Sequence, residues 1–275
     1  MNRAEMLAPL KARRAAGEAI VVAGVGSGIT ADAARAGGAD LLACYGTAVY
    51  RILGVPTVLA FLPYDDANKL TLELLPIVVE RARGLPVVGG LGAHDPRRSL
   101  ASLVDAAQAA GASGVTNEPF AGIYGPTFRA ELEATGYGFS RELAMLELAA
   151  RQGLLTLGWA FDPDEARRMA GAGVDVVGTM TGITGAGSTD GAMDAFAAMV
   201  RATRDENPET IVLLHGGPLT DPPSVADALA ATGADGYATG SSAERGPVLS
   251  GVRDAVAAFK RLRTAGADPG QVRRP

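Results

Sequence analysis

The stretch Met169–Met180, MAGAGVDVVGTM, contains the end of an expected helix, a glycine turn and a buried strand. Gly173 stands where a helix closes on a left-handed residue, and Asp175 opens the apolar run that follows. Similar turns occur as AGGAD at 36–40 and ATGADG at 231–236. Parallel strands covered on both faces are continuous apolar runs of this kind, so the repeat predicts helix–strand units that form a parallel sheet.

Apolar, β-branched runs recur along the chain, each followed by a glycine-rich turn and a helical pattern. They predict strands at Ile20–Gly24, Asp40–Cys44, Thr57–Phe61, Val87–Gly90, Gly114–Asn117, Leu154–Trp159, Val174–Met180, Ile211–Leu214 and Gly236–Thr239. This is one more than a barrel needs, and we interpret Thr57–Phe61 as a surplus segment with strand geometry. The predicted fold is α/β: a single (β/α)8 TIM barrel over residues 1–275 with a short N-terminal helix, and a doubly wound open sheet is the alternative.

Three Asp-Pro pairs mark expected helix starts, because an acidic N-cap precedes a proline whose missing N–H costs nothing in the first turn. They are Asp95-Pro96, Asp162-Pro163 and Asp221-Pro222. We therefore assign Asp95 and Asp162 mainly to capping. The tail from Gly266, GADPGQVRRP, is expected to be frayed and without function.

Composition narrows the function classes. The formal charge of -5 argues against nucleic acid or an anionic membrane as main partner. No apolar run approaches the roughly 20 residues that span a bilayer, and no signal peptide begins the chain. The lone Cys44 excludes an internal disulfide and a thiolate-rich zinc site, which indicates a cytoplasmic protein. Lysine is scarce, so no Schiff-base cofactor is expected.

In a barrel the site lies where strands meet the following helices. GVGSG at Gly24–Gly28 departs by one position from the G-x-G-x-x-G pattern, so we expect a tight turn or anion-facing N–H groups and no nucleotide cofactor. The loops after the last two strands are where barrels often bind phosphate or carboxylate. The residues expected to bind a substrate anion at these turns are Gly26, Gly28, Gly216, Gly217, Ser241, Ser242 and Arg245. Ser241 and Glu244 also match a capping box, so Glu244 is as readily a cap as a catalytic acid.

Several side chains at strand ends are candidates for proton transfer. Glu118 follows a buried strand directly, with Pro119 after it, and suits a general base or a metal ligand. His215 follows four apolar residues and should lie at the barrel mouth, whereas His94 is as readily structural as functional. Tyr45 is placed to donate a hydrogen bond to a substrate oxygen.

Two further strand ends offer a metal site and packing residues. Asp65 and Asp66 are the expected ligands of Mg²⁺, which takes one or two carboxylates plus substrate oxygens and waters. Tyr64 is a further hydrogen-bond donor. Cys44 is read as a small buried side chain more readily than as a nucleophile. Trp159 either floors the pocket or packs.

Taken together, the junctions resemble a known family. CYGTAVYR, FLPYDDAN, GLGAHDP, TNEPFAGIYG, HGGPLTDP and GSSAERGP are similar to the phosphoenolpyruvate hydrolase-like TIM-barrel family, also called TIM-barrel signal-transduction proteins, over about Ala19 to Leu262. The family is related to the phosphoenolpyruvate mutase/isocitrate lyase barrels. The resemblance implies a 2-oxo acid or enolate ligand at a strand-end Mg²⁺, a small carboxylate or phosphonate held by glycine-loop N–H groups, and a homo-oligomer that contacts its copies through the N-terminal or outer helices.

The chain departs from the family pattern at two places. Where relatives commonly show Tyr-Asn-Ser-Gly-Arg, this chain has Tyr45-Gly46-Thr47-Ala48-Val49. Arg51 supplies an arginine downstream, and we expect it to bind the substrate as well. Thr179-Met180 stands where relatives commonly have a histidine. These losses imply a less anionic substrate or altered chemistry.

The expected function is an enzyme acting on a small oxo-acid or enol-type carbonyl compound, by hydrolysis or by C–C or C–P cleavage through an enolate-like intermediate. Glu118 and His215 would move protons. Two alternatives stay open: a metal-independent hydrolase or lyase of β-dicarbonyl compounds, and a non-catalytic sensor that binds a metabolite and signals through a partner.

Overall fold

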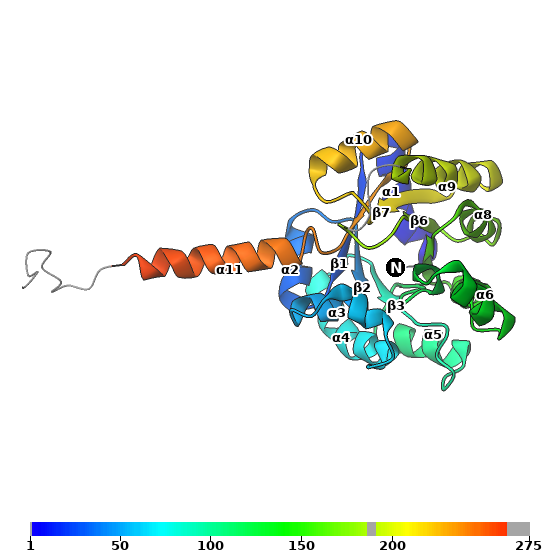
Figure 1. Ribbon diagram of the computed structural model, residues 1–275, viewed down its shortest axis with the longest axis horizontal. Coiled ribbons are helices and arrows are strands. Elements are labelled where there is room, and N and C mark those ends of the chain that lie inside the picture. The colour runs from blue at the N-terminus through cyan, green and yellow to red at the C-terminus, as the bar shows by residue number, and fades with distance from the viewer. Residues whose placement is uncertain (1, 186–190, 263–275) are drawn as a thin grey trace, which may run out of the picture.

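Eight parallel strands close into a barrel in chain order in the computed structural model, which describes residues 2–185 and 191–262 (Figure 1). The strands are β1 (Ile20–Val25), β2 (Leu41–Cys44), β3 (Val87–Gly90), β4 (Gly114–Thr116), β5 (Leu155–Ala160), β6 (Val176–Met180), β7 (Ile211–His215) and β8 (Gly236–Thr239). The pairing of β8 with β1 closes the ring, so the barrel prediction is confirmed and the open sheet is wrong. The predicted frayed tail from Gly266 lies outside the described residues.

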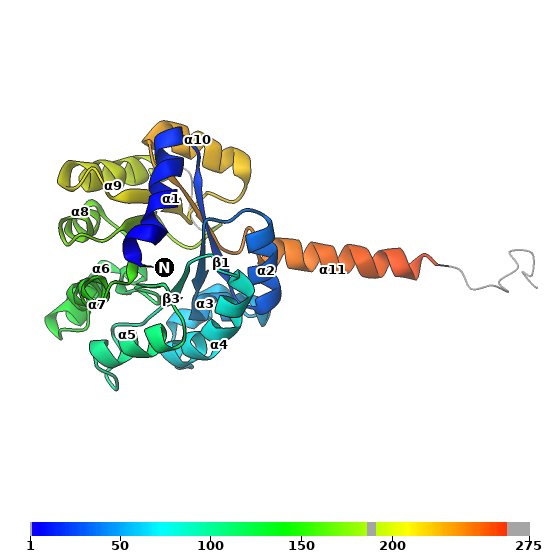
Figure 2. The ribbon, with the colours of Figure 1, turned by 180° about the vertical axis from the view of Figure 1, so that it is seen from behind.

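Helices surround this barrel, and two of them depart from the ring (Figures 1 and 2). The described helices are α1 (Arg3–Ala16), α2 (Gly28–Ala36), α3 (Gly46–Ile52), α4 (Ala67–Ala82), α5 (Leu100–Ala109), α6 (Pro126–Ala134), α7 (Phe139–Arg151), α8 (Pro163–Gly171), α9 (Ala192–Glu206), α10 (Pro222–Thr232) and α11 (Arg245–Lys260), with 3₁₀ turns η1 (Thr57–Phe61) and η2 (Ala121–Ile123). Helix α1 is the predicted N-terminal helix.

The turn chemistry largely follows the sequence prediction. Gly38, Gly173 and Gly233 have φ values of 88°, 75° and 71°, as a left-handed helix end requires. Asp162 and Asp221 cap α8 and α10. The prediction that Asp95 caps a helix is wrong, because α5 begins later, at Leu100, and Ser99 is its N-cap. Asp95 is instead buried and accepts hydrogen bonds from Asn68 and Arg98.

The predicted surplus strand Thr57–Phe61 is wrong as well. It forms the 3₁₀ turn η1, which follows Pro56. Strand β2 pairs directly with β3 through Leu42 and Val87, so the closed barrel leaves no sheet edge for another strand. The turn delivers Phe61 toward Phe120, with ring centroids 5.2 Å apart.

Alternation along the strands produces two apolar clusters. One fills the barrel interior and includes Ile20, Leu41 and Leu157, while the other lies between strands and helices and includes Leu42 and Phe196. Inward and outward side chains thus follow the period of two expected of strands. The interior cluster rises toward the carboxyl ends of the strands, where it meets the polar residues described below.

Helix α1 lies across the amino-terminal end of the barrel (Figure 2). Met6 and Leu10 are 3% exposed and join the interior cluster. Three arginines of α1 pair with the aspartates of the repeated turns: Arg3 with Asp175, Arg13 with Asp40 and Arg14 with Asp235. Each of these aspartates also accepts a backbone N–H, from Thr156, Val21 and Val212 respectively. The sequence motif therefore both ends helices and fastens the base of the barrel.

Helix α11 projects away from the barrel (Figures 1 and 2). It buries none of its residues, and an apolar stripe runs along it: Val248, Leu249, Val252, Val256 and Phe259, which are 40–73% exposed. These positions fall on one side of a helix. Separately, the helices described here include none with both the length and the apolar character needed to cross a bilayer.

Candidate active site

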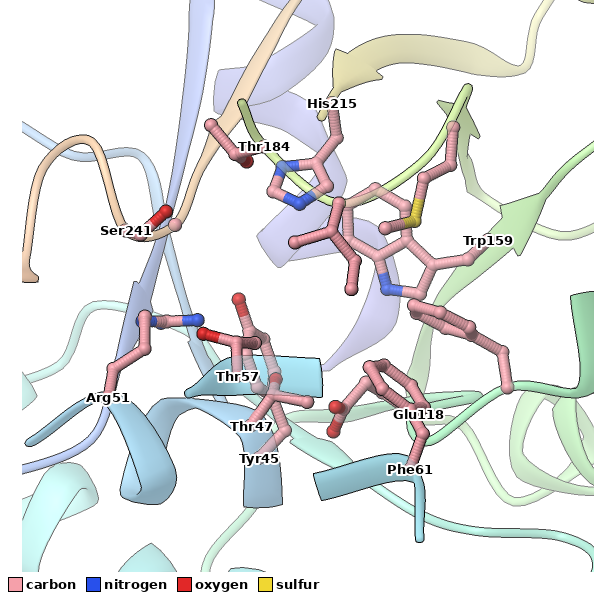
Figure 3. Close-up of a pocket in the computed structure, with 14 residues that line it drawn as sticks. Tyr45, Thr47, Arg51, Thr57, Phe61, Glu118, Trp159, Thr184, His215 and Ser241 are labelled. Atoms are coloured by element: carbon pink, nitrogen blue, oxygen red, sulfur yellow. The ribbon is translucent and has the colours of Figure 1, made fainter. Parts of the chain in front are cut away.

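A small cavity of about 40 Å³ opens at the carboxyl ends of the strands (Figure 3). A cavity of this size suits a compact ligand. The cavity is lined by Tyr45, Thr47, Arg51, Thr57, Phe61, Glu118, Phe120, Trp159, Met180, Ile183, Thr184, His215, Gly240 and Ser241. Glu118, His215 and Tyr45, the three residues predicted to be catalytic, thus lie around one space, together with Arg51 and Ser241 from the predicted binding set.

His215 is the last residue of β7 and points into the cavity (Figure 3). Its Nδ1 lies 2.7 Å from the carbonyl oxygen of Ala238. A carbonyl only accepts hydrogen bonds, so Nδ1 carries the proton and Nε2 presents a lone pair. Burial lowers the pKa of His215 to about 4, and Arg51 adds to that effect. The imidazole is therefore neutral near pH 7 and can accept a proton.

Glu118 follows β4 and is 2% exposed. Neither carboxylate oxygen has a hydrogen-bond partner of good geometry among the described residues. Burial raises the pKa of Glu118 to about 7, although the Thr47 hydroxyl and the Arg51 charge act in the opposite direction. A carboxyl group with this pKa exchanges a proton readily near neutral pH. The two proton-transfer candidates thus have pKa values displaced in opposite directions, a pattern typical of an acid and a base sharing a site.

A buried polar network positions the segment that carries Glu118. Asn117 donates to Glu142 Oε2 at 2.6 Å and accepts from the backbone N–H of Trp159 at 2.7 Å. Glu142 of α7 also accepts from the Ala121 N–H at 2.6 Å, so it holds both sides of the loop. Burial raises the pKa of Glu142 to about 8. The sequence prediction of the site did not include Asn117 or Glu142. The one signal in the sequence was Glu142 itself, a glutamate on a helix face that is buried in the structure.

Arg51 is the cationic side chain of the cavity and reaches it from α3. Its Nε donates to Glu244 Oε2 at 2.8 Å and its Nη2 to the Gly24 carbonyl at 3.1 Å. No described residue accepts a hydrogen bond from Nη1, and a Cβ at Gly240 would lie 3.7 Å from it. The guanidinium is thus anchored on one side and open to the cavity on the other.

Tyr45 caps α3 and lies beside this guanidinium, whose carbon is 5.5 Å from the ring centroid. Burial raises the pKa of Tyr45 against the effect of Arg51, so the phenol keeps its proton near pH 7. Gly24 makes room for it, because a Cβ there would lie 2.0 Å from the hydroxyl oxygen. Gly90 does the same for Glu118, since its Cβ would lie 3.0 Å from Oε2 and 2.4 Å from the Tyr45 Cβ.

The predicted glycine donors lie near the cavity but do not line it. The Gly26 N–H is already bonded to Glu244 Oε1 at 2.7 Å, and Gly28 faces Ile77 and Arg81. Gly217 donates to the Gly182 carbonyl at 3.1 Å. A Cβ on Gly216, whose φ is 76°, would lie 2.1 Å from the same carbonyl oxygen. These glycines are explained by close backbone packing.

The loop after β8 divides its predicted residues. Ser241 lines the cavity, whereas Ser242 lies by Tyr237, and Arg245 donates to the Val55 carbonyl. Glu244 does not form the predicted reciprocal cap, for it is itself the N-cap position of α11 and makes no side-chain cap. It is 3% exposed and instead bridges Gly26 and Arg51.

The predicted metal ligands lie in a neighbouring cavity of about 610 Å³. Asp65 accepts from the Tyr50 hydroxyl, and Asp66 caps α4 and pairs with Arg97 and Arg98. His94 and Tyr64 line this second cavity too. Within the described ranges no three histidine, cysteine, aspartate or glutamate side chains are grouped as a metal site. Asp190, another strand-end acid, lies outside the described residues.

Four further residues named in the sequence analysis are Cys44, Trp159, Thr179 and Met180. Cys44 is buried, and burial raises the pKa of its thiol, which suits the structural interpretation. Trp159 lines the cavity and its indole N–H has no partner among the described residues. At the family departure after β6, Thr179 donates to the Leu213 carbonyl and Met180 lines the cavity.

The fold and this cavity define a (β/α)8-barrel protein with a compact, partly polar site at its strand ends. The sequence model of the phosphoenolpyruvate hydrolase-like family matches residues 5–262, and the chain belongs to that family.

Two relatives illustrate the family. The ToMV susceptible protein tm-1(GCR26) of Solanum lycopersicum is 37% identical over 271 residues, which cover 95% of this chain and 36% of that protein. The putative transcriptional regulatory protein y4pA of Sinorhizobium fredii is 31% identical over 276 residues, covering 95% and 44%. The chain thus spans less than half the length of these relatives.

Solved structures share the fold. Phosphonopyruvate hydrolase in complex with oxalate and Mg²⁺ has a TM-score of 0.66 at 18% identity, covering 95% of this chain and 88% of that one. The 2,3-dimethylmalate lyase, a PEP mutase/isocitrate lyase superfamily member, has a TM-score of 0.63 at 17% identity, covering 99% and 93%. The predicted likeness to these barrels is confirmed at the level of the fold.

Proposed function

We propose that the protein is an enzyme acting on a small oxo-acid or enol-type carbonyl compound, which it cleaves at a C–C or C–P bond through an enolate-like intermediate. One observation carries the proposal: buried Glu118 and His215, with pKa values displaced in opposite directions, face the same cavity as Arg51. The fold neighbours phosphonopyruvate hydrolase and 2,3-dimethylmalate lyase support the reaction class.

Each polar group has a task in such a cleavage. His215 Nε2 accepts a proton from the substrate or an attacking water, and Glu118 in its protonated form returns one to the enolate carbon. Arg51 Nη1 and the Tyr45 hydroxyl face the developing oxyanion. A preorganised donor of this kind is worth about 3 kcal/mol of transition-state stabilisation.

The magnesium expectation fits the donor set poorly. Mg²⁺ prefers one or two carboxylates with waters and substrate oxygens. Among the cavity residues that the structure describes, only Glu118 carries a carboxylate, its pKa is about 7, and Arg51 shares the space. Asp65 and Asp66 are engaged in the neighbouring cavity. This donor set favours the metal-independent alternative, cleavage of a β-dicarbonyl compound, and we route no step through a metal.

A panel of oxo acids and β-diketones, followed by loss of enol absorbance in the presence of EDTA and again with Mg²⁺, tests the proposal. We expect turnover of at least one compound by the wild-type protein and its collapse in Glu118→Gln. Wild-type protein that binds a compound tightly and never turns it over contradicts the enzyme, and favours a sensor. The relative y4pA, a putative transcriptional regulatory protein, supports that second candidate.

We also propose that the chain forms a homo-oligomer through α11. The helix after the last strand of a barrel ordinarily joins the outer ring, but α11 projects with its apolar stripe uncovered. On the barrel itself Ile29 of α2 is 82% exposed, so a second copy offers an apolar partner for that stripe.

Light scattering during size-exclusion chromatography tests the oligomer. We expect wild-type protein to exceed the chain mass of 27.9 kDa, and Val252→Asp with Val256→Asp to return to it. Arg253→Ala, on the same helix, is the matched control and should keep the larger mass. A monomeric wild-type protein would contradict the proposal.

A further inference from the structure

We propose that the cavity selects compact, singly charged oxo acids with an apolar substituent over dianions such as dicarboxylates and phosphonates, and binds them without a divalent cation. The inference rests on the proposed function, since it specifies the substrate of that same site. A substrate with a C–P bond is a phosphonate, so this selectivity narrows the proposed reaction to C–C cleavage.

The charges of the cavity balance for a single substrate carboxylate. Arg51 is the cationic side chain that lines it, and Glu244 already neutralises this guanidinium at 2.8 Å, with side chains only 4% and 2% exposed. Only Nη1 is free of a hydrogen bond to a described residue, so one substrate oxygen can be met by a charged donor. A second negative charge would have no cation to meet among the lining residues.

Glu118 strengthens this discrimination. When ionised, it places a negative charge in the same cavity, and the Thr47 hydroxyl and the backbone N–H groups of Gly46 and Thr47 offset that charge without returning the pKa of Glu118 to its ordinary value. An anionic ligand therefore favours the protonated carboxyl, and a dianion does so more strongly than a monoanion. Nearby titratable groups do not offset the charge: burial raises the pKa of Cys44 and Tyr45, which stay protonated, and lowers the pKa of His215, which stays neutral.

The rest of the wall calls for an apolar substituent. Phe120, Met180 and Ile183 line the cavity, as do Phe61 and Trp159, which lie across it from Arg51 (Figure 3). Placing a carboxylate or phosphonate against these side chains would remove it from water without a compensating donor. The remaining polar groups, such as Thr47 and Ser241, are neutral and suit a carbonyl oxygen.

The isosteric pair pyruvate and oxalate tests the inference, since the two have the same number of non-hydrogen atoms and differ by a methyl group in place of a carboxylate oxygen. Trp159 is the sole tryptophan of the chain and lines the cavity, so its fluorescence reports occupancy without turnover. In EDTA at about pH 8 we expect pyruvate to bind about tenfold more tightly than oxalate. The melting temperature supplies a second readout of binding.

Three results would overturn the inference. They are oxalate that binds as tightly as pyruvate, affinity for either compound that depends on Mg²⁺, and pyruvate that changes neither readout at millimolar concentration. A protein that binds with the expected preference but cleaves no compound would instead refute the proposed enzyme and leave the selectivity standing.

Variants isolate the contribution of Glu118. In Glu118→Gln, oxalate affinity should rise about tenfold, and the weakening of pyruvate binding between about pH 6 and pH 8 should disappear. Glu165→Gln is the matched control, because Glu165 is also a buried glutamate with a pKa raised to about 7, yet it pairs with Arg129 outside the cavity. This control should keep the wild-type selectivity; if it behaves like Glu118→Gln, the assignment to Glu118 is wrong.

Discussion

Three aspartates at the amino-terminal end of the barrel are paired, whereas several buried polar groups at the carboxyl end lack partners in the described part of the chain. At the amino-terminal end, Asp40, Asp175 and Asp235 each hold an arginine of α1 and a backbone N–H. At the carboxyl end, the two oxygens of Glu118 and the indole N–H of Trp159 are buried without a partner among the described residues.

This contrast separates stability from function within one fold. Paired groups at the base fasten helix to strand, and an unpaired buried group costs free energy that a folded chain tolerates where a ligand can complete it. Breaking the base should therefore cost stability and spare the chemistry. Changing the mouth should do the reverse.

The largest effect is expected at the mouth. His215→Gln removes the imidazole lone pair, and loss of a general base lowers kcat by about 10² to 10⁴. Adding Glu118→Gln should cost far less than the product of the two single losses, because the residues act as a unit. Steady-state kinetics on a substrate found in the panel measures both. Multiplicative losses would show that the two residues act independently.

At the base, Asp235→Ala should destabilise the fold without touching catalysis. Both carboxylate oxygens of Asp235 accept from Arg204 Nη2 at 2.6 Å, and Asp235 pairs with Arg14 at 3.2 Å. Because the arginines are partly exposed, we expect the free energy of unfolding to fall by about 2 to 4 kcal/mol. Urea denaturation measures this change. A large drop in kcat for the folded variant would contradict the separation of stability at the amino-terminal end from catalysis at the carboxyl end.

The pH dependence of stability sharpens the comparison. The folded-state pKa of Glu118, about 7, exceeds the ordinary 4.5, so the folded state binds the extra proton and this residue lowers stability as pH rises between these values. Relative to wild type, Glu118→Gln should gain on the order of 2 kcal/mol on going from about pH 4.5 to pH 7. His215 acts oppositely, since its lowered pKa makes its contribution grow with pH between about 4 and 6.5. Urea titrations across this pH range measure the free energy of unfolding of both proteins. If wild type and Glu118→Gln show the same pH dependence, the burial of an unpaired carboxyl at Glu118 is contradicted.

The smallest effect is expected at the predicted metal ligand Asp66. Asp66→Asn keeps a good N-cap and loses the pairs with Arg97 and Arg98, so stability should fall by about 0.5 to 1 kcal/mol. Activity should stay within about twofold of wild type, with or without Mg²⁺. Loss of activity that added Mg²⁺ restores would show that Asp66 does hold a metal ion needed for the reaction.

Much of the fold was predictable because its signals are local. Gly38, Gly173 and Gly233 mark helix ends through their own backbone conformation, and the apolar runs after them mark buried strands. The segment Thr57–Phe61 has the composition of a strand, but the availability of a partner strand decides strand formation, and that is a property of the closed barrel.

The site was predictable where position along a strand fixes the location of a side chain. Glu118 and His215 follow strands directly, so a common rim brings them together. Glu244 shows where this reasoning stops. Its spacing from Ser241 fits a local cap, but closure of the barrel places it against Arg51, 193 residues away in sequence. The other oxygen of the Glu244 carboxylate accepts from the N–H of Gly26, which the sequence analysis expected to bind a substrate anion.

Glu244 links the ligand site to the surface of the molecule. It stands at the N-cap position of α11, and its carboxylate holds the guanidinium that faces the cavity. The projecting helix therefore begins beside the group that orients the cavity's cation. A partner bound along α11 would act on that end of the helix, so we expect ligand affinity to change with the assembly state of the chain.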